Sequence, residues 1–391
     1  MTGARRTRVL IVDDSAAMRS LLRSVVASDP SLEVAGTAAD GASALPLLDI
    51  VKPDLILLDV EMPVMDGLAT LRELRKRGRK VPVIVCSALT QRGAKVTIEA
   101  LAGGASDYVA KPAGQPNRDI AAQNLAQDLL PKIHALTGRP LPQRTPQPVL
   151  PGAHPPAAPP AAGLLLQFAP ELRPQPIFSA PAVVAIGVST GGPAALDVLL
   201  PELAANFPLP ILVVQHMPEV FTRLFAERLN QRCRLRVREA AEGASVRAGN
   251  IYIARGNWHM EVLGAASAAA AATLHLTQAP LENHCRPSVD PMLRSAARAY
   301  GAGVLAVILT GMGSDGMNGC RAVREAGGSV LAQDQASSTV WGMPGAVAGA
   351  GLAHKILPLA SMAAEIQRMA SRAGADARET SPMPEPHRMA V

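Results

Sequence analysis

The sequence has few cysteines, no long apolar run and no concentrated basic segment. Its four cysteines, Cys86, Cys233, Cys285 and Cys320, lie far apart and form no CxxC pair. They are predicted to be reduced thiols, and the spacing argues against a disulfide framework or a zinc site. No apolar stretch approaches the roughly 20 residues that a helix needs to cross a bilayer, and the first apolar strand is too short for a signal-peptide core. We therefore expect a cytoplasmic protein with no membrane insertion.

The charge balance is moderately basic, with 38 Lys and Arg against 32 Asp and Glu. These basic residues are scattered and are not interleaved with aromatic side chains, so nucleic-acid binding is not expected. A length of 391 residues favours two domains, while 34 prolines and 32 glycines indicate long irregular segments.

The first domain is predicted over residues 1–138, where short apolar strands alternate with helical patterns. About five such βα units indicate an α/β fold with a parallel, doubly wound, flavodoxin-like sheet. Polar residues follow the expected strands, and the carboxyl ends of parallel strands converge in one crevice. The residues at these ends are Asp13, Asp14, Asp59, Ser87 and Lys111.

Carboxylates clustered without histidine or thiolate suit a hard cation such as Mg²⁺. Asp59 could then attack a phosphoryl group, with Lys111 offsetting the added charge and Ser87 donating to a phosphoryl oxygen. Alternatively, Asp13 and Asp14 only cap a helix and Asp59 only ends a strand.

A family resemblance covers this whole first domain. Val9–Ser15, Leu57–Gly67, Cys86-Ser87-Ala88 and Lys111-Pro112 resemble a response-regulator receiver domain. The resemblance implies phosphorylation on Asp59, and Mg²⁺ bound by Asp14, Asp59 and the Glu61 carbonyl with Asp13 assisting. It also places Ser87, Tyr108 and Lys111 at the positions of a phosphorylation switch.

Residues 139–181 form a predicted linker, with thirteen prolines between Pro140 and Pro181. Such a segment favours semi-rigid polyproline II structure. Its apolar island, Leu164–Phe168, either packs on a neighbouring domain or docks a partner. A second domain is expected over residues 182–371 and a disordered tail over 372–391.

The second domain again alternates strands and helices, which predicts a second doubly wound parallel sheet. His259–Leu263 and Thr273–Thr277 alternate like an antiparallel hairpin, joined by the alanine-rich Gly264–Ala272. Ser189 follows the apolar strand Val183–Val188 at a glycine-rich corner. His216 follows a second strand, and Asp315 follows a third.

These three residues can meet at the strand ends as nucleophile, general base and orienting acid. The alternatives are a plain strand-to-helix connection at Ser189, a structural His216 and a capping Asp315. Gly311-x-Gly313-x-x-Gly316 also matches a dinucleotide fingerprint, but it closes the domain rather than opening it, and Asp315 would repel a pyrophosphate.

The second domain carries a further resemblance. Ile186–Pro193, Gln215–Pro218, Arg286–Asp290, Leu309–Gly316 and Trp341–Pro344 resemble the chemotaxis protein-glutamate methylesterase/glutaminase family (CheB). The resemblance implies a Ser189, His216 and Asp315 triad, with Thr190 and the Met312 backbone near the oxyanion. It implies no cofactor for the esterase step.

The two resemblances together imply a phosphorylation-activated serine hydrolase. Its expected substrates are glutamate methyl esters and glutamines of chemoreceptors in membrane arrays, and its expected phosphodonor is a chemotaxis histidine kinase. The rival hypotheses are a non-enzymatic adaptor controlled by a receiver, and an esterase that serves another signalling array.

Overall fold

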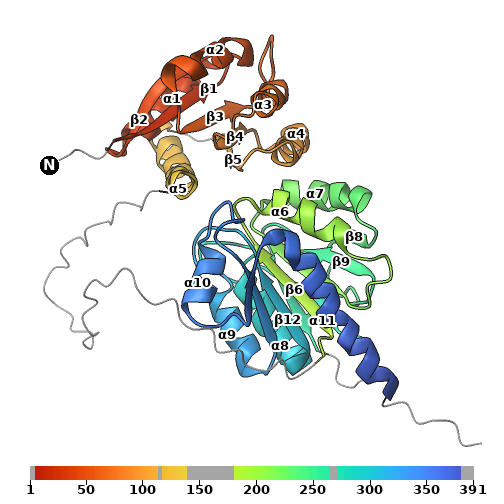
Figure 1. The fold of residues 1–391 in the computed structure, drawn as a ribbon. Coiled ribbons are helices and arrows are strands. Elements are labelled where there is room, and N and C mark those ends of the chain that lie inside the picture. Colours follow the sequence, from red (N-terminus) through yellow and green to blue (C-terminus); the bar gives the residue numbers. More distant parts are fainter. Residues whose placement is uncertain (1–4, 113–116, 139–179, 265–270, 380–391) are drawn as a thin grey trace, which may run out of the picture.

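The computed structural model describes residues 5–112, 117–138, 180–264 and 271–379. They form two α/β domains (Figure 1). Most of the predicted linker, including Leu164–Phe168, lies outside the described residues, as do 265–270 of the alanine-rich insertion and 380–391 of the predicted tail.

The N-terminal domain is a five-stranded parallel sheet with the strand order β2-β1-β3-β4-β5. This order confirms the expected flavodoxin-like sheet. The strands are β1 (Thr7–Val12), β2 (Leu32–Ala38), β3 (Leu55–Asp59), β4 (Val83–Ser87) and β5 (Asp107–Ala110). The helices are α1 (Ala16–Ala27), α2 (Gly41–Val51), α3 (Gly67–Lys76), α4 (Gln91–Ala102) and α5 (Arg118–Thr137).

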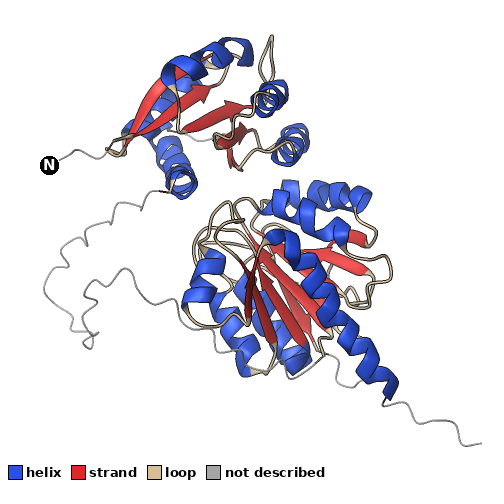
Figure 2. Ribbon diagram, viewed as in Figure 1, coloured by secondary structure: helices blue, strands red, loops and turns tan. Residues whose placement is uncertain are grey.

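Local sequence accounts for these elements. Strand β3 is buried along its whole length, as its run of apolar residues predicts. Ser15 caps α1 by accepting from the Met18 amide at 3.3 Å, and Asp66 caps α3 by accepting from the Ala69 amide at 2.7 Å. Helices cover both faces of the sheet (Figure 2).

The C-terminal domain has a seven-stranded sheet ordered β14-β13-β12-β6-β7-β9-β8, and every pairing in it is parallel. Its strands are β6 (Val183–Val188), β7 (Ile211–Gln215), β8 (Arg236–Glu239), β9 (Asn250–Ile253), β12 (Val304–Ile308), β13 (Ser329–Gln333) and β14 (Lys355–Leu357). Sequence patterns did not predict the short edge strands β8 and β14, because neither has a sustained apolar run.

Helices pack on both faces of this sheet (Figures 1 and 2). They are α6 (Gly192–Leu199), α7 (Glu219–Arg232), α8 (Val289–Tyr300), α9 (Met317–Glu325), α10 (Met343–Gly349) and α11 (Leu359–Glu379), with short 3-10 turns η1 (Leu200–Glu202) and η2 (Gly301–Gly303). Helix α11 continues beyond residue 372, where the tail was expected to begin. None of the helices within the described ranges is long and apolar enough to span a bilayer.

The expected hairpin is present as a separate two-stranded antiparallel sheet. Strands β10 (His259–Leu263) and β11 (Thr273–Thr277) pair with His259 opposite Thr277 and Leu263 opposite Thr273. The hairpin packs against α8, which places the segment between β11 and α8 beside the carboxyl ends of the main strands.

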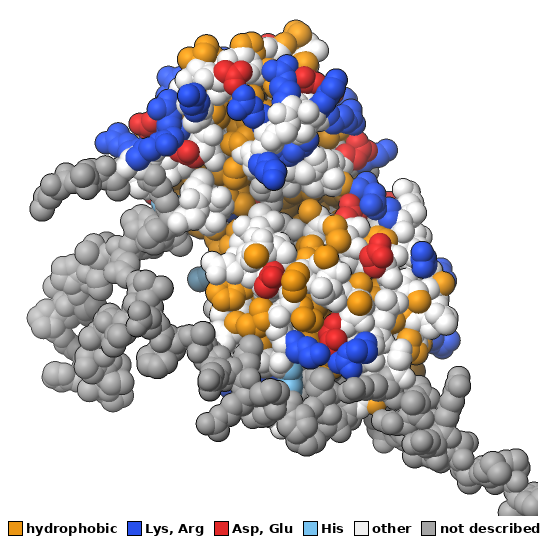
Figure 3. Space-filling model, in the orientation of Figure 1, with side chains coloured by type: hydrophobic (Ala, Val, Ile, Leu, Met, Phe, Trp, Pro, Cys, Tyr) orange, Lys and Arg blue, Asp and Glu red, His pale blue; other side chains and the backbone are white. Residues whose placement is uncertain are grey.

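The two domains contact each other through α4 and the edge strand β5 of the N-terminal domain, which meet α6, α7 and the Ser189 corner of the C-terminal domain. Helix α4 packs against α6 and α7, and the Tyr108 ring stacks on Phe221 of α7 with centroids 4.9 Å apart. In the space-filling view the domains touch, and Lys and Arg are interspersed with Asp and Glu on the upper domain (Figure 3). This interface brings β5 of one domain to the Ser189 corner of the other.

Candidate active site

Ser189 lies at the corner between β6 and α6, at the point where the strand order of the sheet reverses. Strand β6 pairs with β12 on one side and β7 on the other, which is the position where open α/β sheets place their sites. The corner is tight. Gly191 has a φ of +77°, and a Cβ on Gly192 would lie 2.1 Å from Gln215 Oε1. Glycine is therefore required at both positions.

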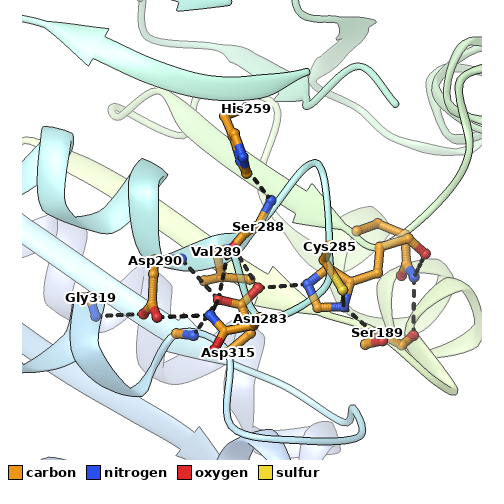
Figure 4. Close-up of polar contacts among 12 residues, drawn as sticks. Ser189, His259, Asn283, Cys285, Ser288, Val289, Asp290, Asp315 and Gly319 are labelled. Carbon is orange, nitrogen blue, oxygen red and sulfur yellow. Dashed lines mark hydrogen bonds and ion pairs between the residues drawn. The ribbon is translucent and has the colours of Figure 1, made fainter. Parts of the chain in front are cut away.

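His216 immediately follows β7 and faces Ser189. Its Nδ1 lies 3.0 Å from Ser189 Oγ, and its Nε2 lies 2.7 Å from Asp315 Oδ2 (Figure 4). Because an ionised carboxylate only accepts, Nε2 carries the proton and Nδ1 presents its lone pair to the serine. Gln215 ties the two corners together by donating to the carbonyls of Ser189 and His216, each at 3.1 Å.

Asp315 is 2% exposed and is held by the start of α8. The Val289 amide donates to Oδ2 at 2.7 Å, while the Ser288 hydroxyl and the Asp290 amide donate to Oδ1 at 2.8 and 3.1 Å. Free amides at a helix N-terminus stabilise an anion. The Arg286–Asp290 motif thus provides the donors that keep this carboxylate in place.

The pKa values of this pair move in opposite directions. Burial alone raises the pKa of Asp315, but the hydrogen bond and charge of His216 and the donors of α8 outweigh it, so that pKa is lowered. Burial alone lowers the pKa of His216, but hydrogen bonds to Asp315 and Cys285 and their charges raise it to about 10. Asp315 therefore stabilises an imidazolium.

Cys285 is the unexpected member of the site. Its Sγ lies 3.5 Å from His216 Nδ1, the same nitrogen that faces Ser189 (Figure 4). The sequence predicted only a reduced thiol here, and all four cysteines are free. The serine oxygen and the cysteine sulfur therefore both face one imidazole nitrogen, and the sulfur can accept a hydrogen bond from Nδ1–H once His216 is protonated.

Replacing this thiol is expected to make His216 less basic. In Cys285→Ala the pKa of His216 should fall by about 1, equivalent to about 1.4 kcal/mol, which is the scale of a hydrogen bond to a charged group. An NMR titration of the imidazole measures this directly. Cys233→Ala, at the end of α7, should leave the titration unchanged. Identical titrations of wild type and Cys285→Ala would contradict the shared contact.

The backbone around Ser189 offers unused amides. In the described part of the chain, the amides of Thr190 and Met312 donate to no protein acceptor. Gly311 lies directly against the serine, because a Cβ there would be 2.9 Å from Ser189 Cβ. The segment after β12 therefore brings the Met312 backbone close to the Ser189 corner. Thr190 lies at the same corner, because it directly follows Ser189.

The N-terminal domain contains a second cluster, at the carboxyl ends of β1 and β3. One carboxylate oxygen from each of Asp13, Asp14 and Asp59 lies within 4.8 Å of the others. Lys111 Nζ lies 2.8 Å from Asp13 and 2.6 Å from Asp59. The structure thus brings together four of the five predicted strand-end residues, and their oxygen donors fit a hard divalent cation.

Lys111 offsets one of the three carboxylate charges in this cluster. Burial raises the pKa of Asp59, and the nearby Asp13 charge adds to that effect while Lys111 opposes it. Burial alone lowers the pKa of Lys111, but its hydrogen bonds to both carboxylates make the net change a rise. Glu61 Oε1 lies 3.2 Å from Arg92 Nε, and the backbone amide of Glu61 donates to Asp59 Oδ1 at 3.2 Å.

Two of the predicted switch residues, Ser87 and Tyr108, lie farther along the same sheet, while the third, Lys111, is part of the acidic cluster. Ser87, at the end of β4, is fully buried, and its hydroxyl donates to the Ala88 carbonyl at 3.3 Å. Tyr108 is buried in β5 against Phe221 of the other domain. The neighbouring Asp107 accepts a hydrogen bond from Thr190 Oγ1 at 2.6 Å. The residue after Ser189 is thereby linked to the N-terminal domain.

Comparisons with known proteins agree with both domains. Residues 184–366 match the family described as CheB methylesterase, and residues 9–121 match the response regulator receiver domain. A protein from Nocardioides sp. named protein-glutamate methylesterase/protein-glutamine glutaminase is 46% identical over 93% of this chain and 96% of its own length. One of the same name from Trichodesmium erythraeum is 44% identical over 92% and 98%.

The chain belongs to the CheB family. A crystal structure of the Thermotoga maritima CheB methylesterase catalytic domain is 40% identical, covers 49% of this chain and all of its own, and has a TM-score of 0.47. Family membership confirms the resemblance inferred from the sequence motifs, and the folds of the receiver and the catalytic domain confirm the predicted α/β class.

Sequence reasoning missed several residues that contact the site. Asn283 and Cys285 precede the Arg286–Asp290 motif, in a segment with no strand or helix pattern. Gln215 belongs to the Gln215–Pro218 motif, but the motif did not indicate that its side chain donates to the Ser189 and His216 carbonyls. Asp107 contacts the site only because the two domains dock, which no local pattern reports.

Proposed function

We propose that this chain hydrolyses glutamate γ-methyl esters, and glutamine γ-amides, on chemoreceptors. The observation that carries the proposal is the connected set Ser189 Oγ, His216 Nδ1 and Asp315 Oδ2, within a domain of the CheB family. Its relatives carry the names of both activities. The test is methanol release from methylated receptors, with and without a small phosphodonor such as acetyl phosphate.

In the acylation step, Ser189 Oγ attacks the γ-carbonyl carbon and its proton passes to His216 Nδ1. The carbonyl oxygen becomes an oxyanion, which the free amides of Thr190 and Met312 would stabilise. Asp315 stabilises the imidazolium through Nε2. When the tetrahedral centre collapses, the Nδ1 proton passes to the leaving oxygen or nitrogen, and methanol or ammonia departs.

In the deacylation step, water takes the place of the leaving group. His216 Nδ1 removes a proton from water, and the water oxygen attacks the acyl carbon. The bond from that carbon to Ser189 Oγ then breaks, Oγ takes the proton from Nδ1, and the glutamate side-chain carboxylic acid is released. Both steps need a neutral imidazole. Because Asp315 and Cys285 raise the pKa of His216, the rate should rise as the pH is increased toward that pKa. The residues of the site suffice for this step without a cofactor.

The receiver domain is proposed to control this chemistry through a phosphoryl group on Asp59. Asp13, Asp14 and Asp59, with the Glu61 carbonyl, would hold Mg²⁺, which screens the negative charge of the incoming phosphoryl group. Lys111 would remain paired with the phosphorylated Asp59 side chain, and the Ser87 hydroxyl would turn toward its phosphoryl group. A chemotaxis histidine kinase is the proposed phosphodonor, and the receptor arrays are the proposed location.

Control would act through the interface between the domains. Tyr108 stacks on Phe221, and Asp107 accepts from Thr190 beside the nucleophile. Phosphorylation adds a charge of about −1.5 to −2 at the carboxyl end of the same sheet. If this weakens docking by about 1.4 kcal/mol, the open form increases tenfold.

Asp59→Asn is expected to abolish both phosphoryl incorporation and stimulation by acetyl phosphate, because an amide cannot form the acyl phosphate. Incorporation can be followed by mass spectrometry with Mg²⁺ present. Asp66→Asn is the matched control, because Asp66 follows the same strand but caps α3. Normal incorporation into Asp59→Asn would assign the phosphoryl group to another residue.

A further inference from the structure

The segment between β11 and α8 forms a tight turn beside the active site. The Glu282 amide donates to the Cys285 carbonyl at 3.2 Å, and the Cys285 amide donates to the Glu282 carbonyl at 2.8 Å. The two central residues, Asn283 and His284, have φ values of +51° and +62°. Positive φ at both positions is the pattern of a type I′ turn, in which asparagine is favoured.

This turn is anchored to α8 and contacts both members of the proposed base–acid pair. Arg294 Nη2 donates to Glu282 Oε1 at 2.6 Å. Cys285 contacts His216 Nδ1, and Asn283 Nδ2 lies 2.8 Å from Asp315 Oδ1. Through Asn283 the turn contacts the Asp315 oxygen that does not accept from His216, and through Cys285 it contacts the imidazole (Figure 4).

The Asn283 amide bridges two buried carboxylates. Its Nδ2 lies 3.0 Å from Asp290 Oδ2 as well as 2.8 Å from Asp315 Oδ1, and each carboxylate is 2% exposed. A primary amide has two N–H groups, so one can go to each acceptor. The other oxygen of Asp290 accepts from the Gly319 amide, which fixes this carboxylate between α8 and α9.

The Asn283 bridge matters because the Asp290 and Asp315 carboxylates repel each other when both are ionised. Burial raises the pKa of Asp290, and the Asp315 charge raises it further. Like charges in a buried site disfavour ionisation of both groups unless donors lie between them. Arg294 on α8 opposes this effect at Asp290, and Lys132 of α5 contributes positive charge near Cys285. Asn283 supplies the donor that faces both acids.

We propose that Asn283 is a positioning residue for the hydrolytic reaction, whose amide holds Asp315 toward His216 and separates it from Asp290. Asn283 is itself exposed, so it also covers this carboxylate pair on the solvent side. The inference rests on the proposed function, but the contact it assigns can be measured without the reaction.

The decisive variant is Asn283→Asp, which keeps the size of the side chain and tolerates the left-handed backbone. It replaces a donor with an acceptor and adds a negative charge near the imidazolium, so the pKa of His216 should rise. On the acid limb of the pH profile, a rise of 1 lowers the neutral imidazole fraction about tenfold. We expect about a tenfold loss of kcat at neutral pH, partly recovered at higher pH, with KM little changed.

Asn283→Gly removes the side-chain amide but keeps the backbone of the turn, because glycine adopts positive φ readily. Water can replace the amide at this exposed position, so a smaller loss of kcat, about threefold to tenfold, is expected. His284→Gly is the matched control. It changes the other central residue of the same turn, which makes no contact with the carboxylates in the described hydrogen bonds, and should retain wild-type kcat and pH dependence.

An NMR titration of the His216 imidazole, performed on the same full-length variants, separates the two ideas. A wild-type protein without methanol release would overturn the proposed function, whatever the titrations show. An active wild type whose Asn283→Asp and Asn283→Gly variants match His284→Gly in kcat, pH profile and His216 titration would overturn the positioning role. A shifted titration together with a lower kcat supports it.

Discussion

Ser189→Ala is expected to lower methanol release from methylated receptors by at least about a thousandfold, because the nucleophile that His216 activates is lost. His216 Nδ1 would then face only the Cys285 thiol, which lies 3.5 Å away rather than the 3.0 Å of the serine oxygen. The free amides of Thr190 and Met312 would remain, so a small residual rate above water is consistent with the proposal. The assay uses the full chain with acetyl phosphate present.

Ser314→Ala provides the matched control for this loss. Ser314 is exposed and lies one residue before Asp315, so the change removes a hydroxyl from the same loop without touching the triad. Labelling with a serine-reactive phosphonate should disappear in Ser189→Ala and persist in Ser314→Ala. Retention of more than a tenth of wild-type turnover by Ser189→Ala would remove the serine from its proposed role. Absence of labelling in the wild type would favour a non-enzymatic adaptor.

Residues at strand ends were predictable because the sheet itself brings them together. Ser189, His216 and Asp315 each follow an apolar strand, and the parallel pairing of β12, β6 and β7 places those ends side by side. The same rule placed Asp13, Asp59 and Lys111 in contact. A sequence pattern is sufficient in such cases, because a predicted parallel strand fixes where the residue that follows its carboxyl end must lie.

The turn at Asn283 was not predictable by that rule. Its position depends on how the hairpin β10–β11 packs on α8, and its backbone conformation depends on two positive φ values. The dipeptide Asn283-His284 does not predict a tight turn unless strands are expected on both sides of it. The contact between Asp107 and Thr190 is still less accessible from sequence, since 83 residues separate the two and the domains must dock before they meet.

Asp107→Ala is expected to raise the rate without phosphodonor about tenfold and to leave a smaller further stimulation by acetyl phosphate. Asp107 is 7% exposed and accepts from Thr190 Oγ1 at 2.6 Å. A hydrogen bond to a charged, buried acceptor contributes about 1.5–3 kcal/mol, and each 1.4 kcal/mol corresponds to a tenfold change in the docked population. Releasing Thr190 would therefore favour the undocked form.

Thr190→Val tests the same contact from the other domain, because it removes the hydroxyl and keeps the backbone amide proposed for the oxyanion. If the bond between Thr190 and Asp107 restrains the docked form, the double variant should show little more basal methanol release than the stronger single variant. Asp128→Ala, which removes an exposed partner of Lys132 on α5, is the control for altered receiver charge. Additive effects, or an unchanged basal rate in Asp107→Ala, would show that docking does not depend on this bond.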